Sequence, residues 1–453
     1  MRILLLTTSY PTAPGDFRGG FVEDYARELA SLGHDVHVLV PHPGGDALES
    51  ESANGITIER IRSPRLLGDG SSAFGELGVL TAVAHTPAKA ADVALALAAL
   101  TRRALEAARS SDLVITHWLV PGGIIGAVLS HLRGIPHIAV EHGGGARVLA
   151  RMPGRALALR FILSGSAAVQ LVSRQIKERL AQAVPSCAER LEALSLVFPA
   201  PIASDGQVPS ARHYLPPSRI LFVGRLVPGK GLEILLTAMR QLRHARLTVV
   251  GDGPQRTLLA DPTDGDGLRS RVTLTGFVPR PDLDVIYRAH DILVIPSLAG
   301  LFDQVQGNGA SPKSDVRGAP RPLQAQVGVD VHAGNALTAG SLPRSTGEGL
   351  PRVLLEGMAA GLVPVVSRVG GMPDLVRDGE NGLVFPPGDA EALARCLRSL
   401  ANNPKLCARL SARARKAAAR YTFPQLARLL DIRLRAVGIE HRLERPRFLR
   451  RHR

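Results

Sequence analysis

Short runs of branched apolar residues alternate with helical stretches along the chain, and this alternation limits the fold more than any other feature. The runs predict strands, and residues 21–33 between the first two are typical of a helix that ends at Gly33. Parallel sheets covered by helices on both faces have this pattern. We expect strands in two sets, at 2–8, 35–41, 112–118, 137–143 and 167–173, and at 219–225, 246–253, 272–276, 291–297, 363–368 and 382–385.

A segment rich in proline and serine separates the two sets, as expected of a linker. We therefore predict an α/β fold with two Rossmann-like, doubly wound domains that face a central cleft. Ligands of such sheets bind at the carboxyl ends of the strands, so the cleft is the expected site. The predicted units are an N-terminal domain (1–198), a linker (199–218), a C-terminal domain (219–420), a terminal helix that crosses back (421–439) and a basic tail (440–453).

Residues 299–345 interrupt the alternation with many glycines, prolines, serines and glutamines and with no helical or strand period. Loops longer than about 15 residues in a compact domain are usually functional or disordered. We expect a disordered, dispensable insertion. The fold can tolerate it, because each doubling of a loop's length costs only about 0.6 kcal/mol.

The composition excludes several classes of protein. The three cysteines have no zinc or CxxC spacing and fit a reducing, cytoplasmic compartment. No apolar run approaches the roughly 18 residues of a membrane span, and the start "MRILLLTTSYP" is interpreted as a first strand rather than a signal peptide. The formal charge of +15 favours anionic partners. Nucleic acid is not expected, because aromatic residues are only 4% and no nucleic-acid-binding motif occurs.

Two carboxylates, Glu348 and Glu356, stand on either side of an apolar run in "TGEGLPRVLLEGMAAG". Pro351 is best placed in the first turn of a helix, so Glu348 is expected in the preceding loop and Glu356 in the second turn. Such carboxylates accept hydrogen bonds from sugar hydroxyls, and a helix N-terminus suits phosphate. Judged from the spacing alone, the simpler alternative is that Glu348 is a surface residue, Glu356 is an ordinary helix residue, and neither has a functional role.

Cationic and glycine-rich loops follow the first strand of each domain. Arg225 and Lys230 in "VGRLVPGKG" are placed where a clamp on a diphosphate is expected. Gly19 and Gly20 in "DFRGGFVED" would let a backbone approach a phosphate closely. Solvated surface cations and a tight turn without a ligand are the competing interpretations.

The ordered set of motifs resembles glycosyltransferase family 4, retaining enzymes with the GT-B fold that build bacterial cell-surface polysaccharides or glycolipids. The resemblance covers nearly the whole chain apart from 299–345. The matching segments are "RGGFVEDYARELASLGHDVHVLVP", "THWLVPGG", "EHGG", "VGRLVPGKGL", "VVGDGP", "LTGFVP", "DILVIPS", "GEGLPRVLLEGMAAGLVPVVSRVGGMPDLV" and "DGENGLVFPPGD".

The resemblance implies an N-terminal acceptor-binding domain and a C-terminal domain that binds a nucleotide-diphosphate sugar as substrate, without a further cofactor or a metal. Arg225 and Lys230 would neutralise the diphosphate as charge builds on it. Glu348 would contact hydroxyls of the donor sugar, and the backbone of Gly349 and Leu350 would face the phosphates.

The same resemblance implies that Glu356 binds the ribose hydroxyls. It also implies that Gly19 and Gly20 approach the diphosphate from the opposite domain. His117 in "THWLVPGG" matches a histidine near the reaction centre that would orient the donor sugar or the acceptor. The implied route is front-face displacement, in which the departing phosphate oxygen takes the acceptor proton.

The acceptor is expected to be a hydroxyl of a polysaccharide, a lipid-linked intermediate or a glycolipid. Two alternatives stay open: a nucleotide-sugar epimerase on the same fold, and a binding protein whose site is impaired by residues 299–345. Arginines interleave with apolar residues in 141–163, which fits either a membrane-surface patch or a solvated basic helix face. We also expect the protein to associate peripherally with the inner face of a membrane.

The acidic "DLD" at 282–284 is interpreted as N-terminal capping of a helix rather than as a metal motif.

Overall fold

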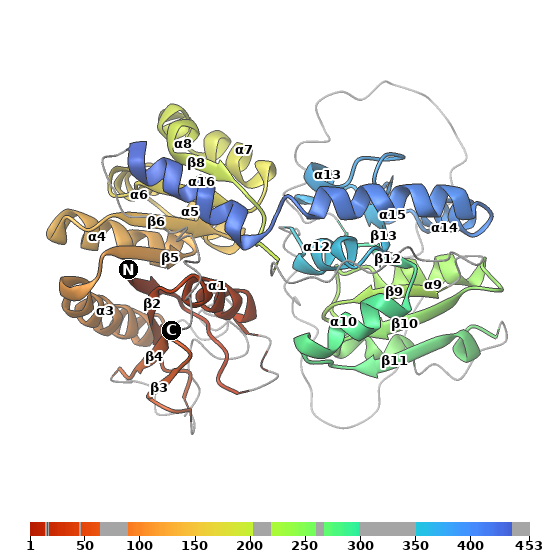
Figure 1. Ribbon diagram of the computed structural model, residues 1–453, viewed down its shortest axis with the longest axis horizontal. Helices are drawn as coiled ribbons and strands as arrows, with labels where there is room; N and C mark the ends of the chain where they lie inside the picture. Colours follow the sequence, from red (N-terminus) through yellow and green to blue (C-terminus); the bar gives the residue numbers. More distant parts are fainter. Residues whose placement is uncertain are drawn as a thin grey trace, which may run out of the picture.

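The computed structural model describes residues 1–13, 16, 18–44, 47–63, 89–202, 219–259, 267–298 and 350–436. Two α/β domains lie side by side in this part of the chain (Figure 1). Four predicted features lie wholly or mostly outside the described residues: the linker 199–218 beyond residue 202, the insertion 299–345, the tail 440–453, and the pair Glu348 and Gly349.

The N-terminal sheet has the strand order β3-β4-β2-β1-β5-β6-β7-β8. All its neighbouring strands pair in parallel except β3 with β4. The hairpin β3–β4 and the short β8 were not predicted from the sequence. The strands are β1 (Arg2–Leu6), β2 (Asp35–Pro41), β3 (Ser50–Ala53), β4 (Ile56–Ile61), β5 (Leu113–His117), β6 (His137–Glu141), β7 (Ala168–Leu171) and β8 (Ser195–Val197).

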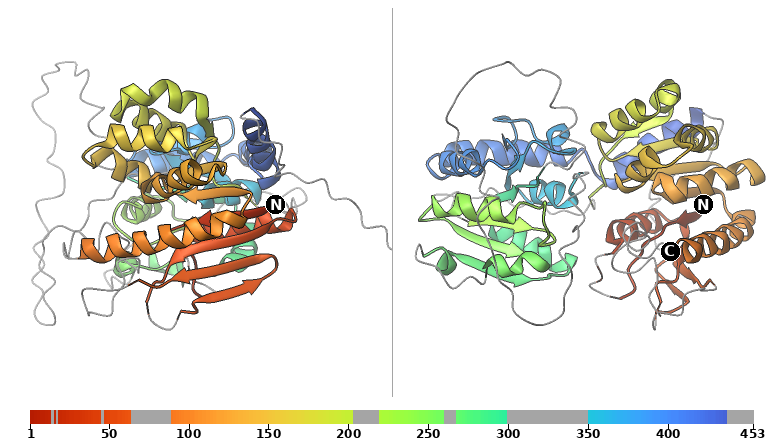
Figure 2. Two further views of the ribbon diagram at one scale, coloured as in Figure 1. Left: turned by 90° about the vertical axis from the view of Figure 1, so that its left-hand side faces the viewer. Right: turned by 180° about the vertical axis from the view of Figure 1, so that it is seen from behind.

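Helices cover both faces of this sheet, as the alternation predicts (Figures 1 and 2). The first of them ends as expected, because Gly33 adopts φ +83° directly after the helix. The helices are α1 (Gly20–Ser31), α3 (Lys89–Ala107), α4 (Ile124–Arg133), α5 (Gly144–Arg151), α6 (Arg155–Ser164), α7 (Arg174–Ala183) and α8 (Ala188–Leu194).

The C-terminal sheet is parallel throughout, with the order β11-β10-β9-β12-β13-β14 among the described strands. Its strands are β9 (Arg219–Val223), β10 (Arg246–Val250), β11 (Val272–Gly276), β12 (Ile292–Ile295), β13 (Val363–Ser367) and β14 (Leu383–Phe385). Its helices are α9 (Leu232–Arg240), α10 (Arg280–Ala289), α12 (Arg352–Ala359), α13 (Met372–Leu375), α14 (Ala390–Ala401) and α15 (Pro404–Ala418).

The last described helix, α16 (Phe423–Ala436), returns to the N-terminal domain (Figure 1). Its buried residues Phe423, Leu426 and Leu430 belong to the same apolar cluster as strands β1 and β2. The crossing is fixed at its start, where Ile202 N donates to Tyr421 O at 3.0 Å. The C-terminal end of the chain thus completes the core of the first domain.

The three cysteines are free thiols, as their spacing predicts. No helix within the described ranges is both long and apolar enough to cross a bilayer.

The packing of α16 leads to a first prediction. Leu430 is 1% exposed, so Leu430→Ala should lower the free energy of unfolding by about 2–5 kcal/mol through the cavity it leaves. Ile432 on the same helix is 56% exposed, and Ile432→Ala should change stability by no more than about 0.5 kcal/mol. Urea denaturation measures both. Equal effects of the two substitutions would mean that α16 is not docked as described.

Candidate functional site

The loop between β9 and α9 carries the two predicted cations. β9 lies in the middle of its sheet, between β10 and β12, and the loop leaves its carboxyl end. Arg225 is exposed there and Lys230 is half-buried. No carboxylate of the described residues pairs with the Arg225 guanidinium, so its charge is directed to solvent. The loop therefore presents positive charge at the edge where ligands of parallel sheets bind.

Glycine is required at the end of this loop. Gly231 adopts φ +74°, and a Cβ atom there would lie 1.9 Å from the carbonyl oxygen of Pro296. The loop after β12 is also tied to it, since Leu298 N donates to Gly229 O at 2.8 Å. The backbone that carries Lys230 is therefore held against the neighbouring strand end.

The two glycines before α1 have different surroundings. Gly19 adopts φ +68°, and a Cβ atom on it would meet Ser9 O at 2.2 Å, so the fold itself demands a glycine. A Cβ atom on Gly20 would have no described atom within 4 Å. Among the described residues, no side chain caps the backbone N–H groups at the start of α1.

The start of α12 lies one residue later than predicted, because Pro351 is the N-cap rather than a residue of the first turn. Pro351 stands at the N-cap with φ −64°, directly after Leu350, and the helix begins at Arg352. Glu356 lies in the second turn with a side chain that is 16% exposed. Both of its carboxylate oxygens have partners. The Tyr287 hydroxyl donates to Oε2 at 3.0 Å, and Arg352 Nε lies 3.2 Å from Oε1.

Arg352 joins the two domains. While its Nε atom lies against Glu356, its Nη1 atom donates to the carboxylate of Asp24 on α1. A chain of polar contacts thus runs from Tyr287 through Glu356 and Arg352 to Asp24. Through it the predicted ribose-binding carboxylate is placed opposite the first helix of the N-terminal domain.

A second polar contact between the domains involves Asp374, which follows β13. Its carboxylate accepts a hydrogen bond from Arg174 N, the first residue of α7, at 2.7 Å. Burial raises the pKa of Asp374, and the bond to the Arg174 backbone opposes that shift. The N-terminus of α7 therefore holds an anion supplied by the other domain.

His117 ends β5 and is completely buried. Its Nδ1 atom lies 2.9 Å from Nε2 of His142, and the two rings are stacked with an interplanar angle of 5°. Tyr25 contacts His117 edge-on, with ring centroids 5.3 Å apart. His117 can therefore act on a ligand in the cleft only through its neighbours.

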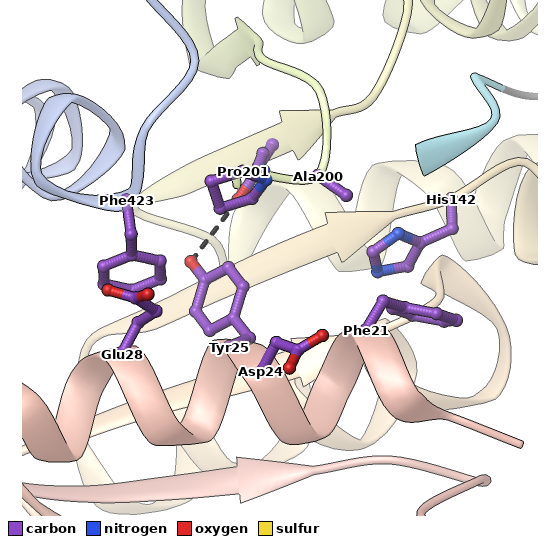
Figure 3. A pocket seen from close by; sticks show the side chains of 9 residues that line it. Phe21, Asp24, Tyr25, Glu28, His142, Ala200, Pro201 and Phe423 are labelled. Carbon is purple, nitrogen blue, oxygen red and sulfur yellow. Dashed lines mark hydrogen bonds between the residues drawn. The ribbon is translucent and has the colours of Figure 1, made fainter. Parts of the chain in front are cut away.

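His142, which follows β6, lies near Arg352 of the C-terminal domain, because the positive charge of that arginine acts on its ring. It lines a small hollow of about 10 Å³, together with Phe21, Asp24, Tyr25, Glu28, Gln170, Ala200, Pro201 and Phe423. Figure 3 shows α1 forming one side of this hollow, with His142 across from Phe21. His142 was not among the residues predicted from the sequence. The signal was present, because His117 is the last residue of β5 and His142 directly follows β6, the neighbouring parallel strand.

Both histidine rings are neutral near pH 7. Burial, and then the nearby His142, keep the pKa of His117 well below its ordinary value. Burial, and then the positive charge of Arg352, lower the pKa of His142 to about 3. The single proton between the facing nitrogen atoms therefore joins two neutral rings, and it fixes the orientation of both.

Glu141 holds the loops that carry this pair. Its buried carboxylate accepts hydrogen bonds from Leu119 N at 2.8 Å and from Gly143 N at 2.5 Å. Burial raises its pKa, which these bonds oppose. A Cβ atom at Gly145 would lie 2.4 Å from Oε2 of Glu141, so the carboxylate needs a glycine beside it.

The interpretation of "DLD" as a side-chain cap was wrong. Pro279 occupies the N-cap of α10, and no side chain makes a capping hydrogen bond. Asp282 lies in the first turn, where the helix dipole favours a negative charge, and Asp284 pairs with Arg288 at 2.7 Å. Within the described ranges, no group of three or more histidines, cysteines or acids is arranged to hold a metal ion.

The structure thus brings some predicted residues together and leaves others apart. Glu356 and the start of α1 face each other across the Arg352 contact, while Arg225 and Lys230 share the carboxyl edge of the C-terminal sheet. His117 lies behind His142.

Three family models match the chain in the order of its domains. The model described as "Glycosyl transferase 4-like domain" matches residues 19–196. Two models described as "Glycosyl transferases group 1" match residues 217–308 and 336–417.

Curated relatives are also glycosyltransferases by name. The chain is 24% identical to the uncharacterized glycosyltransferase MJ1178 of Methanocaldococcus jannaschii over 65% of its own length and 67% of the relative's. It is 30% identical to MJ1607 of the same organism over 39% of the chain and 33% of the relative. It is 29% identical to the amylovoran biosynthesis glycosyltransferase AmsK of Erwinia amylovora over 41% of the chain and 36% of the relative. Matches to two of these three span only about a third of the relatives' length.

Solved structures share the fold over nearly the whole chain. Sucrose-phosphate synthase of Thermosynechococcus elongatus superposes with a TM-score of 0.67 at 19% identity, over 97% of this chain and 99% of the other. Anabaena HepE, solved in complex with UDP, superposes with a TM-score of 0.63 at 18% identity, over 96% of this chain and all of the other. The family models, the relatives and the two facing parallel-sheet domains agree, and the chain belongs to the GT4-type glycosyltransferases with the GT-B fold.

Proposed function

We propose that this protein transfers a sugar from a nucleoside-diphosphate sugar to a hydroxyl group of an acceptor saccharide or lipid-linked saccharide. The observation that carries the proposal is the unpaired guanidinium of Arg225 at the carboxyl edge of β9, on the sheet whose helix α12 carries Glu356. A diphosphate needs such a cation, and a ribose needs such a carboxylate. The UDP bound to HepE supports this class of donor.

In the proposed reaction, Arg225 and Lys230 bind the diphosphate and stabilise the negative charge that grows as it departs. Glu348 contacts the donor sugar, and the backbone of Gly349 and Leu350 faces the phosphates. The open start of α1 at Gly20 approaches the same phosphates from the other domain.

Glu356 holds the ribose. In this proposal, the Glu356 carboxylate accepts hydrogen bonds from the ribose hydroxyls while Tyr287 and Arg352 contact it from the protein side. The same contacts hold the carboxylate in place before the donor arrives, which lowers the ordering cost of binding.

We further propose that the transfer retains the anomeric configuration and needs no metal or other cofactor. The acceptor oxygen forms a bond to the anomeric carbon on the face from which the diphosphate leaves, and the departing phosphate oxygen takes the acceptor proton. Of the two histidines, we assign the contact with the reacting sugars to His142, because His117 is completely buried and Arg352 of the C-terminal domain lies near the His142 ring. His117 fixes the orientation of the His142 ring.

The proposed acceptor is a growing cell-surface polysaccharide, a lipid-linked intermediate or a glycolipid. The name of AmsK supports polysaccharide synthesis. A lipid-linked acceptor lies at a membrane, so we also propose that the protein is cytoplasmic and associates peripherally with the inner face of a membrane.

An epimerase would release an altered nucleotide sugar, whereas a transferase would attach the sugar to the acceptor. Incubation with radiolabelled donor and extracted acceptor distinguishes these two products.

Thermal-shift screening with nucleoside-diphosphate sugars tests the donor. The preferred donor at about 100 times its Kd should stabilise the protein by about 2.7 kcal/mol and raise Tm accordingly. Arg225→Gln should weaken donor binding about 10-fold or more, because it removes a charged hydrogen bond to phosphate.

Arg246→Gln is the matched control, since Arg246 is exposed at the start of β10, on the opposite edge of the same sheet. A Tm that no donor raises would contradict the proposal and favour a protein with an impaired site. An equal loss of affinity in both variants would mean that net charge, rather than the loop, binds the donor.

Deoxyribose analogues test the role of Glu356. Wild-type protein should bind the preferred nucleoside diphosphate about 10-fold more tightly than its 2′- or 3′-deoxy analogue, because a hydrogen bond to a charged carboxylate is lost. Glu356→Gln should reduce this preference, as measured by titration calorimetry. If the substitution weakens both ligands equally, Glu356 supports α12 and does not contact the ribose.

A deletion separates the transferase from the impaired binding protein. A variant that lacks residues 299–345 should keep or exceed the wild-type rate of sugar transfer, measured with radiolabelled donor. Circular dichroism checks that the variant is folded. A folded variant without transfer would make the segment an integral part of the site.

A further inference from the structure

One long stretch of the N-terminal domain is almost free of acidic residues. Between residues 113 and 177, Glu141 is the single aspartate or glutamate, and its side chain is buried. The same stretch contains seven lysines and arginines. The helices α4, α5 and α6 therefore contain no carboxylate of their own.

Large apolar side chains are exposed on the same surface. Leu157 and Phe161 lie one turn apart on α6, 70% and 37% exposed, and Leu132 at the end of α4 is 65% exposed. The Phe161 ring stacks on His131 of α4, with centroids 5.3 Å apart. The two helices pack closely, since a Cβ atom on Gly165 would lie 2.7 Å from Ala127 Cα. The apolar groups thus form one surface across two helices.

Exposed arginines alternate with these apolar groups. Arg133 follows Leu132 on α4, and Arg160 precedes Phe161 on α6. Neither guanidinium pairs with a carboxylate of the described residues. Surfaces that bind a bilayer have this composition, because the apolar side chains enter the boundary between headgroups and acyl chains while the arginines stay at the headgroups.

We infer that the surface of Leu132, Arg133, Leu157, Arg160 and Phe161 docks on an anionic lipid bilayer. The inference rests on the peripheral association included in the proposed function, and it names the surface and the lipid class. Charge complementarity selects the partner, because anionic headgroups attract arginines and no carboxylate of this surface repels them. In Figure 1, α4 and α6 lie on the side of the N-terminal domain away from the C-terminal domain, so docking would leave the space between the domains open.

Co-sedimentation of the full chain with vesicles tests the inference. Wild-type protein should bind vesicles that contain phosphatidylglycerol more tightly than vesicles of phosphatidylcholine alone, and salt should weaken the binding. R133Q/R160Q should lower the partition coefficient about 25-fold, at roughly 5-fold for each arginine, and should reduce its dependence on salt. L132S/L157S should lower it about 10-fold and leave the salt dependence unchanged.

The matched control is V285S/R243Q in the C-terminal domain, where Val285 is 73% exposed and Arg243 is exposed. This variant should bind as the wild type does. A second control, R450S/R451S/R453S, replaces arginines of the basic tail and should keep most of the binding. Equal losses in the controls and in the α4–α6 variants would overturn the inference, as would displacement from vesicles by short RNA at equal phosphate concentration.

The outcomes separate this inference from the proposed function. If wild-type protein binds anionic vesicles and the α4–α6 variants bind equally well, the surface is wrong and peripheral association stands. If wild-type protein binds no vesicles, both the docking surface and the peripheral association are wrong. A donor-induced rise in Tm would still support the transferase in either case, because it needs no lipid.

Discussion

All neighbouring strands that carry the candidate site are parallel, and this single constraint decides where the chemistry can lie. Because parallel strands end at one edge of their sheet, the loops after β1, β5 and β6 gather at one edge of the N-terminal sheet. The loops after β9 and β12 gather in the same way in the C-terminal domain. Arg352 then joins the two sides through Asp24, and residues more than 300 positions apart in the sequence meet.

The fold was largely predictable from the sequence because its signal is repeated. Strands such as "RILLL" and "RLTVV" are nearly continuous apolar runs, as expected for strands buried on both faces. The hairpin β3–β4 escaped prediction because β3, "SESA", is exposed along its whole length and carries no apolar pattern. Strand β8 has only three residues, too few for a period to appear.

The sequence predicted which residue types belong to the candidate site better than it predicted which side chains contact one another there. Arg225 and Glu356 lie where strand ends and helix starts place them, which local sequence can indicate. The contact of Tyr287 with Glu356 could not be derived in this way, because Tyr287 reaches it only after α10 and α12 pack together. Arg352 lies four residues before Glu356 on the same helix, so this ion pair is one that helical spacing indicates. His117 was preferred over His142 for a similar reason. Both follow strands, and only the packing of Tyr25 against His117 decides which ring is covered.

The contact of Asp374 with the start of α7 has a consequence for the selection of anions. Two helices of the N-terminal domain, α1 and α7, begin with backbone N–H groups that could bind a negative charge. Asp374 already fills the start of α7, whereas the start of α1 has no side-chain cap. With the two domains in this arrangement, the C-terminal domain supplies an anion to the start of α7 and none of its described side chains caps the start of α1. A separation of the domains would remove that distinction, because it would uncover the start of α7 as well.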